Sequence, residues 1–306
     1  MGGRALVQWD QNRNNAPSSL HVDIYAGGPA PRTGLEDVAF YQVPYAPSTQ
    51  GVDERLDLLS RLPALEVVQL VSAGYEQVLP LIPDHVTLCN GRGLHDASTA
   101  EHALGLVLAA QRDLPRWAVD QKEHRWGPVP LRSLADCRVV IVGYGSIGQA
   151  IERRLLPFET DVVRVAGRAR PDEGVHGIGE LHDLLPQADI VVLVTPLTDR
   201  TRGLFGAAEF ALLPDDALVV NVGRGPVLDT DALLAQNGRV RAALDVTDPE
   251  PLPAEHPLWD QPSVYLTPHV AGGSAAFYPR ARAFLDDQLA RWASGGPLAN
   301  VVRPGR

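Results

Sequence analysis

The stretch Arg138-Val-Val-Ile-Val-Gly-Tyr-Gly-Ser-Ile-Gly148 runs from a short apolar strand into a Gly-x-Gly-x-x-Gly turn, and helix-forming residues follow it. In such a turn Gly143 permits the sharp bend, Gly145 lets a pyrophosphate approach the backbone, and Gly148 lets the helix pack on the strand. The N-terminus of the helix then faces the anion. A glycine pattern alone is weak evidence, but its place between a strand and a helix favours a dinucleotide site over a purely structural turn.

The composition is that of an ordinary globular protein. The chain has 306 residues, 45% hydrophobic and 21% charged, so it is long enough for two domains that share a cleft. A formal net charge of −10 argues against a nucleic-acid or anionic-membrane partner, and no apolar run approaches the roughly 20 residues that span a bilayer. Cys89 and Cys137 lie outside any metal-ligand spacing, so we expect both to be reduced and expect no metal site. We therefore expect a cytoplasmic protein with a small-molecule substrate.

Apolar strand-like runs alternate with helical segments between residues 138 and 268, which is the pattern of a parallel sheet covered by helices on both faces. The runs are 138–142, 162–166, 190–194, 218–222, 240–245 and 264–267. Before them, weaker strand candidates occur at 5–9, 21–26, 65–71 and 86–88, together with an amphipathic helix near 51–61.

Two further helices are predicted, an apolar one over 98–112 and another over about 275–294. The second comes too late to belong to the large sheet and could return to the first unit. We therefore expect an α/β protein with a doubly wound parallel sheet in its larger domain and a separate, smaller α/β domain. The dinucleotide-binding domain would be 98–275, and the substrate domain would be discontinuous, 1–97 plus 276–306.

Chemically active residues directly follow the strands of the larger domain. Because ligands of an open parallel sheet bind outside the carboxyl ends of its strands, these residues should converge on one edge. Taken singly, an arginine, a glutamate and a histidine could be a turn cation, a solvated loop residue and a core histidine. Together beside a dinucleotide they suffice for hydride transfer to a 2-oxo acid. The residues at these strand ends are Thr195-Pro196, Gly223-Arg224-Gly225, Asp245 to Glu250, and Pro268-His269.

Three of these segments resemble the signature segments of the D-isomer-specific 2-hydroxyacid dehydrogenases. The similarity extends from about Val68 to Gly273, whereas the first 60 or so residues match poorly. Members of this family have two Rossmann-like domains with an active-site cleft between them, and they usually dimerise through the nucleotide domain. The resemblance therefore implies an α/β fold of two Rossmann-like domains with doubly wound parallel sheets, an interdomain active-site cleft and a homodimer. The three segments are Asn221-Val-Gly-Arg-Gly-Pro-Val-Leu-Asp229, Ala243-Leu-Asp-Val-Thr-Asp-Pro-Glu-Pro-Leu252 and Leu266-Thr-Pro-His-Val-Ala-Gly-Gly273.

The resemblance also implies a role for each matching residue. Arg224 would pair with the substrate carboxylate and carbonyl oxygen. His269 would be the general acid in reduction, with Glu250 stabilising its imidazolium. Ala73 and Gly74 would offer backbone N–H groups to the substrate carboxylate, although a simple turn explains Gly74 equally well.

The similarity includes the motif Ala100-Glu101-His102, which begins the apolar helix. We interpret Glu101 and His102 as structural residues.

The segment after the second strand indicates which nicotinamide cofactor to expect. An NAD site wants an acidic residue about 20 positions beyond the glycine turn, whereas a 2′-phosphate needs cations there. Here Gly167-Arg168-Ala-Arg170 follows the strand, which favours NADP(H) over NAD(H); the alternative is that these arginines merely solvate a loop. Asp245 would orient the nicotinamide amide. The complete set of expected cofactor contacts is Gly143, Tyr144, Gly145, Ser146, Ile147, Gly148, Gly167, Arg168, Arg170, Thr195, Pro196, Val222, Gly223 and Asp245.

The resemblance therefore predicts an NAD(P)-dependent D-2-hydroxyacid dehydrogenase. A stretch similar to Gly167–Arg170 occurs in NADPH-preferring glyoxylate/hydroxypyruvate reductases, so we expect reduction of a small 2-oxo acid such as glyoxylate or hydroxypyruvate to a D-2-hydroxy acid. The alternative is a non-enzymatic NAD(H)-binding protein of the same fold, like the transcriptional corepressors. Such a protein would bind the dinucleotide tightly and turn over no 2-oxo acid.

Overall fold

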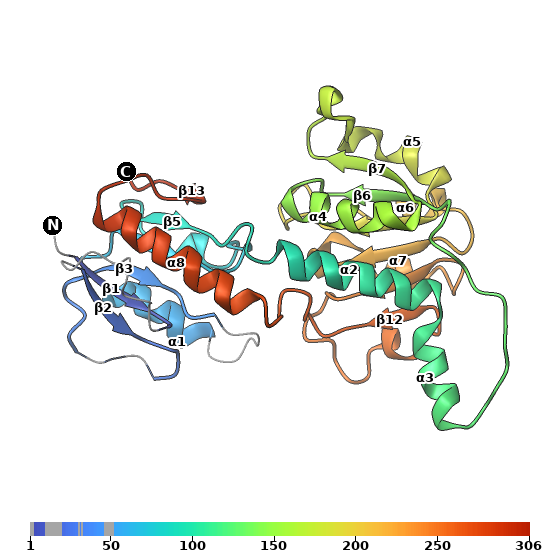
Figure 1. The fold of residues 1–306 in the computed structure, drawn as a ribbon, viewed down its shortest axis with the longest axis horizontal. Coiled ribbons are helices and arrows are strands. Elements are labelled where there is room, and N and C mark those ends of the chain that lie inside the picture. Colours follow the sequence, from blue (N-terminus) through green and yellow to red (C-terminus); the bar gives the residue numbers. More distant parts are fainter. Residues whose placement is uncertain (1–2, 10–19, 30, 32, 46–51) are drawn as a thin grey trace. The chain divides into compact units, whose positions relative to one another are not determined.

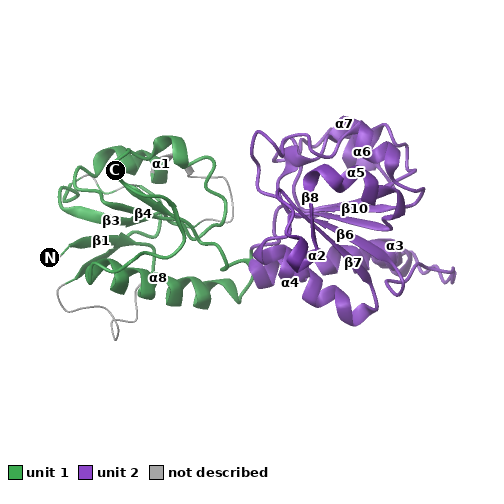
Figure 2. Cartoon of the chain, turned by 90° about the horizontal axis from the view of Figure 1, so that it is seen from above, with its two compact units in different colours: residues 1–95, 273–306 green, residues 96–272 purple. Residues whose placement is uncertain are grey.

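The computed structural model describes residues 3–9, 20–29, 31, 33–45 and 52–306. The chain divides into two compact units, one of residues 1–95 with 273–306 and one of residues 96–272 (Figure 2). Residue 51, the first of the predicted helix near 51–61, lies outside the described residues. No helix in the described part of the chain is long and apolar enough to cross a bilayer.

The larger unit contains a parallel sheet of seven strands in the order β12-β11-β10-β9-β6-β7-β8 (Figure 1). All six predicted strands are present, and no end differs by more than one residue; β8 was not predicted. The strands are β6 (Arg138–Val142), β7 (Asp161–Ala166), β8 (Val175–Gly177), β9 (Ile190–Leu193), β10 (Leu218–Asn221), β11 (Arg241–Leu244) and β12 (Val264–Leu266).

Helices cover both faces of this sheet, because successive side chains of each buried strand point to opposite sides. Val139 and Ile141 of β6 pack with apolar residues of α2 (Asp96–Gln111) and α4 (Ser146–Leu155). Val140 and Val142 pack on the other side with residues of α5 (Leu181–Leu184), α6 (Ala207–Leu212) and α7 (Thr230–Leu234). The loops at the carboxyl ends of the strands are left to form the site.

The smaller unit contains a six-stranded sheet in the order β13-β5-β4-β3-β1-β2, in which only β13 runs antiparallel to its neighbour. Its described helices include α1 (Val52–Asp57) and α8 (Phe277–Ala293), both of which were predicted. The strands β3 and β13 were not predicted; β3 is buried at every position, and β13 is only three residues long. The strands are β1 (Arg4–Val7), β2 (His21–Ile24), β3 (Val38–Gln42), β4 (Val67–Gln69), β5 (Thr87–Cys89) and β13 (Val301–Arg303).

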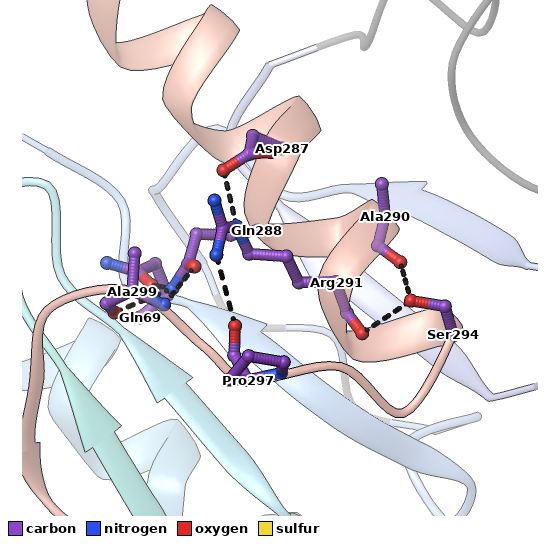
Figure 3. A network of polar contacts seen from close by, with 8 residues as sticks. All are labelled: Gln69, Asp287, Gln288, Ala290, Arg291, Ser294, Pro297 and Ala299. Atoms are coloured by element: carbon purple, nitrogen blue, oxygen red, sulfur yellow. Dashed lines mark hydrogen bonds and ion pairs between the residues drawn. The ribbon is translucent and has the colours of Figure 1, made fainter.

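A buried pair of glutamines ties the C-terminal segment to the smaller unit (Figure 3). Gln288 of α8 and Gln69 of β4 are both 0% exposed, and Nε2 of Gln288 donates to Oε1 of Gln69 across 2.6 Å. The same side chain exchanges two hydrogen bonds with the backbone of Ala299, at 3.1 and 2.7 Å. Because buried amides are costly unless satisfied, this network fixes where the chain returns to the sheet.

Candidate active site

The three glycines of the turn after β6 are needed for different reasons. Gly143 has a φ of +110°, and a Cβ there would lie 2.7 Å from the carbonyl of Val194. A Cβ on Gly148 would lie 2.7 Å from the carbonyl oxygen of Gly143. By contrast, a Cβ on Gly145 would meet none of the described atoms within 4 Å. The middle glycine therefore borders open space at the start of α4, where a phosphate would approach the backbone.

The loop after β9 presents a buried hydroxyl that has no hydrogen-bond partner among the described residues. Thr195 is 8% exposed, and its Oγ1 makes no hydrogen bond to any described residue. A Cβ on Gly223, in the loop after β10, would lie 2.8 Å from the carbonyl oxygen of Thr195, so these two loops are in close contact. A buried hydroxyl left unpaired costs about 1–3 kcal/mol, which a ligand could offset by bonding to it. The residues around the glycine turn thus fit a dinucleotide.

The two arginines after β7 differ in their surroundings. Arg168 is exposed and makes no hydrogen bond or ion pair with the described residues. Arg170 is held in place: its Nε lies 2.9 Å from Oε2 of Glu173, and its Nη2 donates to the carbonyl oxygen of Tyr144 across 3.0 Å. The structure therefore brings Arg170 to the glycine turn and leaves Arg168 available for a ligand.

The side chain of Tyr144 points into the protein, although its backbone belongs to the glycine turn. Its hydroxyl donates to Glu152, which is 6% exposed on α4 and also accepts a 2.8 Å hydrogen bond from Nε of Arg164. Burial and the neighbouring Glu152 carboxylate raise the pKa of Tyr144. Sequence reasoning missed Glu152 and Arg164, because only the fold brings β7, α4 and the turn together.

The structure brings Glu250 and His269 into direct contact. Nδ1 of His269 lies 2.5 Å from Oε1 of Glu250, and both side chains are partly exposed. Arg224 is half-buried and donates from Nη1 to the carbonyl oxygen of Gly223, and among the described residues it bonds to neither Glu250 nor His269. A Cβ on Gly225 would lie 1.8 Å from the carbonyl oxygen of Thr247, so the loop of Arg224 packs against the loop that leads to Glu250.

Asp245, at the end of β11, holds the turn that carries His269. It is 1% exposed; Oδ1 accepts hydrogen bonds from the Thr267 hydroxyl at 2.6 Å and from the Val270 amide at 2.9 Å. Oδ2 accepts from the Ala271 amide at 2.9 Å, and the Asp245 carbonyl oxygen accepts from the His269 amide at 2.7 Å. The carboxylate thus faces the turn.

The environment of Asp245 keeps it ionised. Burial raises the pKa of its carboxyl, but hydrogen bonds from His102, Thr267 and two backbone amides outweigh burial, so the pKa lies below its usual range. Sequence reasoning treated His102 as structural; the structure places its Nε2 3.0 Å from Oγ1 of Thr267 and 3.2 Å from Oδ1 of Asp245. The signal available in the sequence was the Ala100-Glu101-His102 motif. Glu101 is exposed and makes no contact of this kind with the described residues.

In the smaller unit, the loop after β4 exposes backbone donors. Its carbonyls are engaged internally: Ser72 accepts from the Gly91 amide at 2.7 Å, and Ala73 accepts from the Asn90 side chain at 2.8 Å. The N–H groups of Ala73 and Gly74 donate to no described residue. A Cβ on Gly91 would lie 2.3 Å from the carbonyl oxygen of Val71, so only glycine allows this close packing beneath the loop. The loop can therefore offer two N–H groups to an anion.

Comparison with known proteins matches the chain to one family and to several of its members. The family described as "D-isomer specific 2-hydroxyacid dehydrogenase, NAD binding domain" matches residues 104–271. Glyoxylate/hydroxypyruvate reductase B of Escherichia fergusonii is 33% identical over 270 residues, which cover 83% of this chain and 83% of that protein. An uncharacterised protein of Corynebacterium melassecola is 35% identical over 225 residues, which cover 68% of this chain and 72% of that protein.

Solved structures resemble the whole chain. A D-isomer specific 2-hydroxyacid dehydrogenase from Xanthobacter autotrophicus, in complex with NADPH and MES, has a TM-score of 0.81 at 30% identity and covers 99% of this chain and 98% of its own. An NADPH-dependent glyoxylate/hydroxypyruvate reductase from Sinorhizobium meliloti, in complex with NADP and sulfate, has a TM-score of 0.81 at 29% identity, with 98% of both chains covered. The chain therefore belongs to the D-isomer-specific 2-hydroxyacid dehydrogenase family.

Proposed function

We propose that this protein is an NADPH-dependent reductase that converts a small 2-oxo acid, such as glyoxylate or hydroxypyruvate, to the D-2-hydroxy acid. The observation that carries the proposal is the 2.5 Å contact between His269 and Glu250, carried by loops after β12 and β11 of the sheet whose β6 leads into the glycine turn. The names of the similar reductases from Escherichia fergusonii and Sinorhizobium meliloti support this substrate class.

The cofactor would lie along the edge formed by the strand ends. The glycine turn, Gly143 to Gly148, would hold the pyrophosphate, and Thr195 would use its unpaired hydroxyl toward the cofactor. Arg168, assisted by Arg170, would bind a 2′-phosphate, so NADP(H) would be preferred and NAD(H) accepted less well. When bound, reduced nicotinamide supplies the hydride that the substrate carbonyl carbon receives.

The chain's own residues would orient the substrate and move the proton. Arg224 would hold the substrate carboxylate and polarise the carbonyl oxygen. The amides of Ala73 and Gly74 would offer two N–H groups to a substrate carboxylate. A carboxylate only accepts hydrogen bonds, so Nδ1 of His269 carries the proton shared with Glu250. Nε2 is then the atom of the protonated ring that gives a proton to the carbonyl oxygen.

A substrate panel tests the proposal. Initial rates would be measured with glyoxylate, hydroxypyruvate, pyruvate and larger 2-oxo acids, each with NADPH and with NADH, and the product's configuration would be determined. We expect turnover of at least one small 2-oxo acid, faster with NADPH, and a D product. Tight NADPH binding without turnover of any 2-oxo acid would contradict the proposal and favour a dinucleotide-binding protein without enzymatic activity.

We also propose that the protein is a homodimer and works in the cytoplasm. The larger unit extends an arm consisting of α3 (Leu114–Lys122) and residues 123–133, whose exposed apolar side chains include Leu114, Val119 and Trp126, the last 96% exposed. A second copy of this chain would cover such a patch. The two free cysteines suit a reducing compartment. Sedimentation analysis should give twice the chain mass, and the double variant Val119→Asp, Trp126→Ser should sediment as a monomer.

A further inference from the structure

His102 lies at the end of a chain of hydrogen bonds that the proposed reaction does not yet use. Its Nε2 is 3.0 Å from Oγ1 of Thr267 and 3.2 Å from Oδ1 of Asp245. The single hydroxyl proton of Thr267 is donated to Asp245, at 2.6 Å. Thr267 can therefore only accept from His102, and Nε2 of His102 must carry the proton. The imidazole of His102, on α2, thus donates to Thr267 and Asp245, which anchor the loop after β12.

The loop so anchored holds its backbone in an unusual conformation. His269 has a φ of +51°, in the left-handed region that side-chain-bearing residues rarely adopt. Such conformations persist only when several contacts with the surrounding structure hold them in place. Here Asp245 accepts from the amides of Val270 and Ala271 at 2.9 Å each, so the position of its carboxylate sets the geometry of the turn.

We propose that His102 is a positioning residue for the proposed general acid. It fixes the Thr267 hydroxyl and the Asp245 carboxylate, and through them the turn from which His269 reaches its substrate. His102 contacts no described group of His269 itself, so its effect is indirect. The catalytic part of this inference rests on the proposed function, whereas the structural part does not. A purely structural His102 would only join α2 to the sheet and would affect stability without affecting the turn.

Three variants separate these roles kinetically. His102→Leu removes the donor, His102→Gln keeps an amide N–H at similar reach, and Glu101→Gln is the control on the adjacent, exposed position. We expect His102→Leu to lower kcat by roughly 10- to 100-fold, because a small displacement of a catalytic group is costly, while KM for NADPH changes little. His102→Gln should recover most of kcat, and Glu101→Gln should match the wild type. Wild-type kcat in His102→Leu would overturn the proposal.

The variant Thr267→Val tests whether His102 acts on the turn through Thr267. It removes the hydroxyl without changing the side-chain shape, so it should lower kcat in the same way. The double variant with His102→Leu should fall little further than either single variant, because both changes break one chain of bonds. Independent, multiplicative losses would instead mean that His102 acts by another route, and the proposal would be wrong.

Amide hydrogen exchange tests the structural part without any activity. In folded His102→Leu, matched to the wild type in NADPH binding and melting temperature, the Val270 and Ala271 amides should exchange at least several-fold faster than in the wild type. They should stay protected in His102→Gln and Glu101→Gln. Unchanged exchange in His102→Leu would overturn the positioning role. Faster exchange in a protein whose wild type reduces no 2-oxo acid would refute the proposed function alone. If His102→Leu does not fold, Thr267→Val provides the same measurement.

Discussion

Oε1 of Glu250 lies 2.5 Å from Nδ1 of His269, and the two residues come from loops that follow neighbouring strands, β11 and β12. This contact fixes one nitrogen of the imidazole and leaves the other for the substrate. The position of the proposed proton donor therefore depends on the conformation of both loops.

Replacing His269 by Ala removes the group that would give the proton. We expect kcat to fall by roughly 10²- to 10⁴-fold, the usual contribution of general acid catalysis. The dissociation constant for NADPH, measured by fluorescence titration, should stay within about twofold, since the proposed role of the ring is toward the substrate and not the cofactor. His85→Ala, at an exposed histidine without side-chain contacts in the described structure, serves as control. Unreduced turnover in His269→Ala would rule out this residue as the acid.

Arg224→Lys keeps the positive charge but loses the planar fork that can bind a carboxylate and a carbonyl oxygen together. We therefore expect kcat/KM for the 2-oxo acid to fall by about 10²- to 10³-fold, as for loss of an oxyanion donor. Steady-state kinetics would be compared with those of Arg200→Lys, an exposed arginine without ion pairs to described residues. A lysine variant as active as the wild type would show that no bidentate contact is made.

The variant Arg168→Ala should change the preference between NADPH and NADH. The side chain is exposed and unpaired among the described residues, so its loss should not disturb the fold. A charge-assisted hydrogen bond contributes about 1.5–3 kcal/mol, so kcat/KM for NADPH should fall roughly 10- to 100-fold while that for NADH stays almost constant. Arg170→Ala should weaken both cofactors, because Arg170 also bonds to the glycine turn. Wild type that prefers NADH would contradict the cofactor assignment.

Asp245→Asn tests the electrostatics of the turn through stability. The pKa of Asp245 is lower in the folded protein than its ordinary value of 3.8. Its carboxylate therefore stabilises the fold above about pH 4, and this contribution disappears as the pH falls through the folded pKa. At pH 7 the variant should lose about 1–3 kcal/mol of unfolding free energy in urea, because an amide nitrogen cannot accept from a backbone N–H.

The same measurement at low pH shows whether the charge of Asp245 causes the difference in unfolding free energy. Near pH 3 the difference between wild type and Asp245→Asn should shrink, because below the ordinary pKa of 3.8 the unfolded chain takes up a proton at Asp245 and the contribution of the charge to stability declines. Asp199→Asn, an exposed aspartate without contacts to described residues, should show no difference at either pH. An equal loss of stability at pH 7 and pH 3 would indicate that charge plays no part.

The sequence predicts the large sheet well, because strands such as β6 and β9 are continuous apolar runs buried on both faces. It predicts less of the smaller unit, where β3 was missed although it is buried at every position, and where β13 is only three residues long. The hydrogen-bond partners of His102 could not be predicted from the sequence. Thr267 lies 165 residues away, and no periodic pattern links two polar side chains that meet only in the folded protein. The same applies to Glu152 and Arg164.

The smaller unit takes α8 and the edge strand β13 from residues that follow the larger unit in the sequence. Leu285 and Leu289 of α8 complete the apolar cluster that contains Ala5 and Phe40, and β13 pairs with β5. Residues 96–272, by contrast, are contiguous and hold both faces of their own core. During synthesis, residues 96–272 can therefore form their core before residues 273–306 emerge from the ribosome, so strands such as β1 and β3 are covered only after the larger unit has been made.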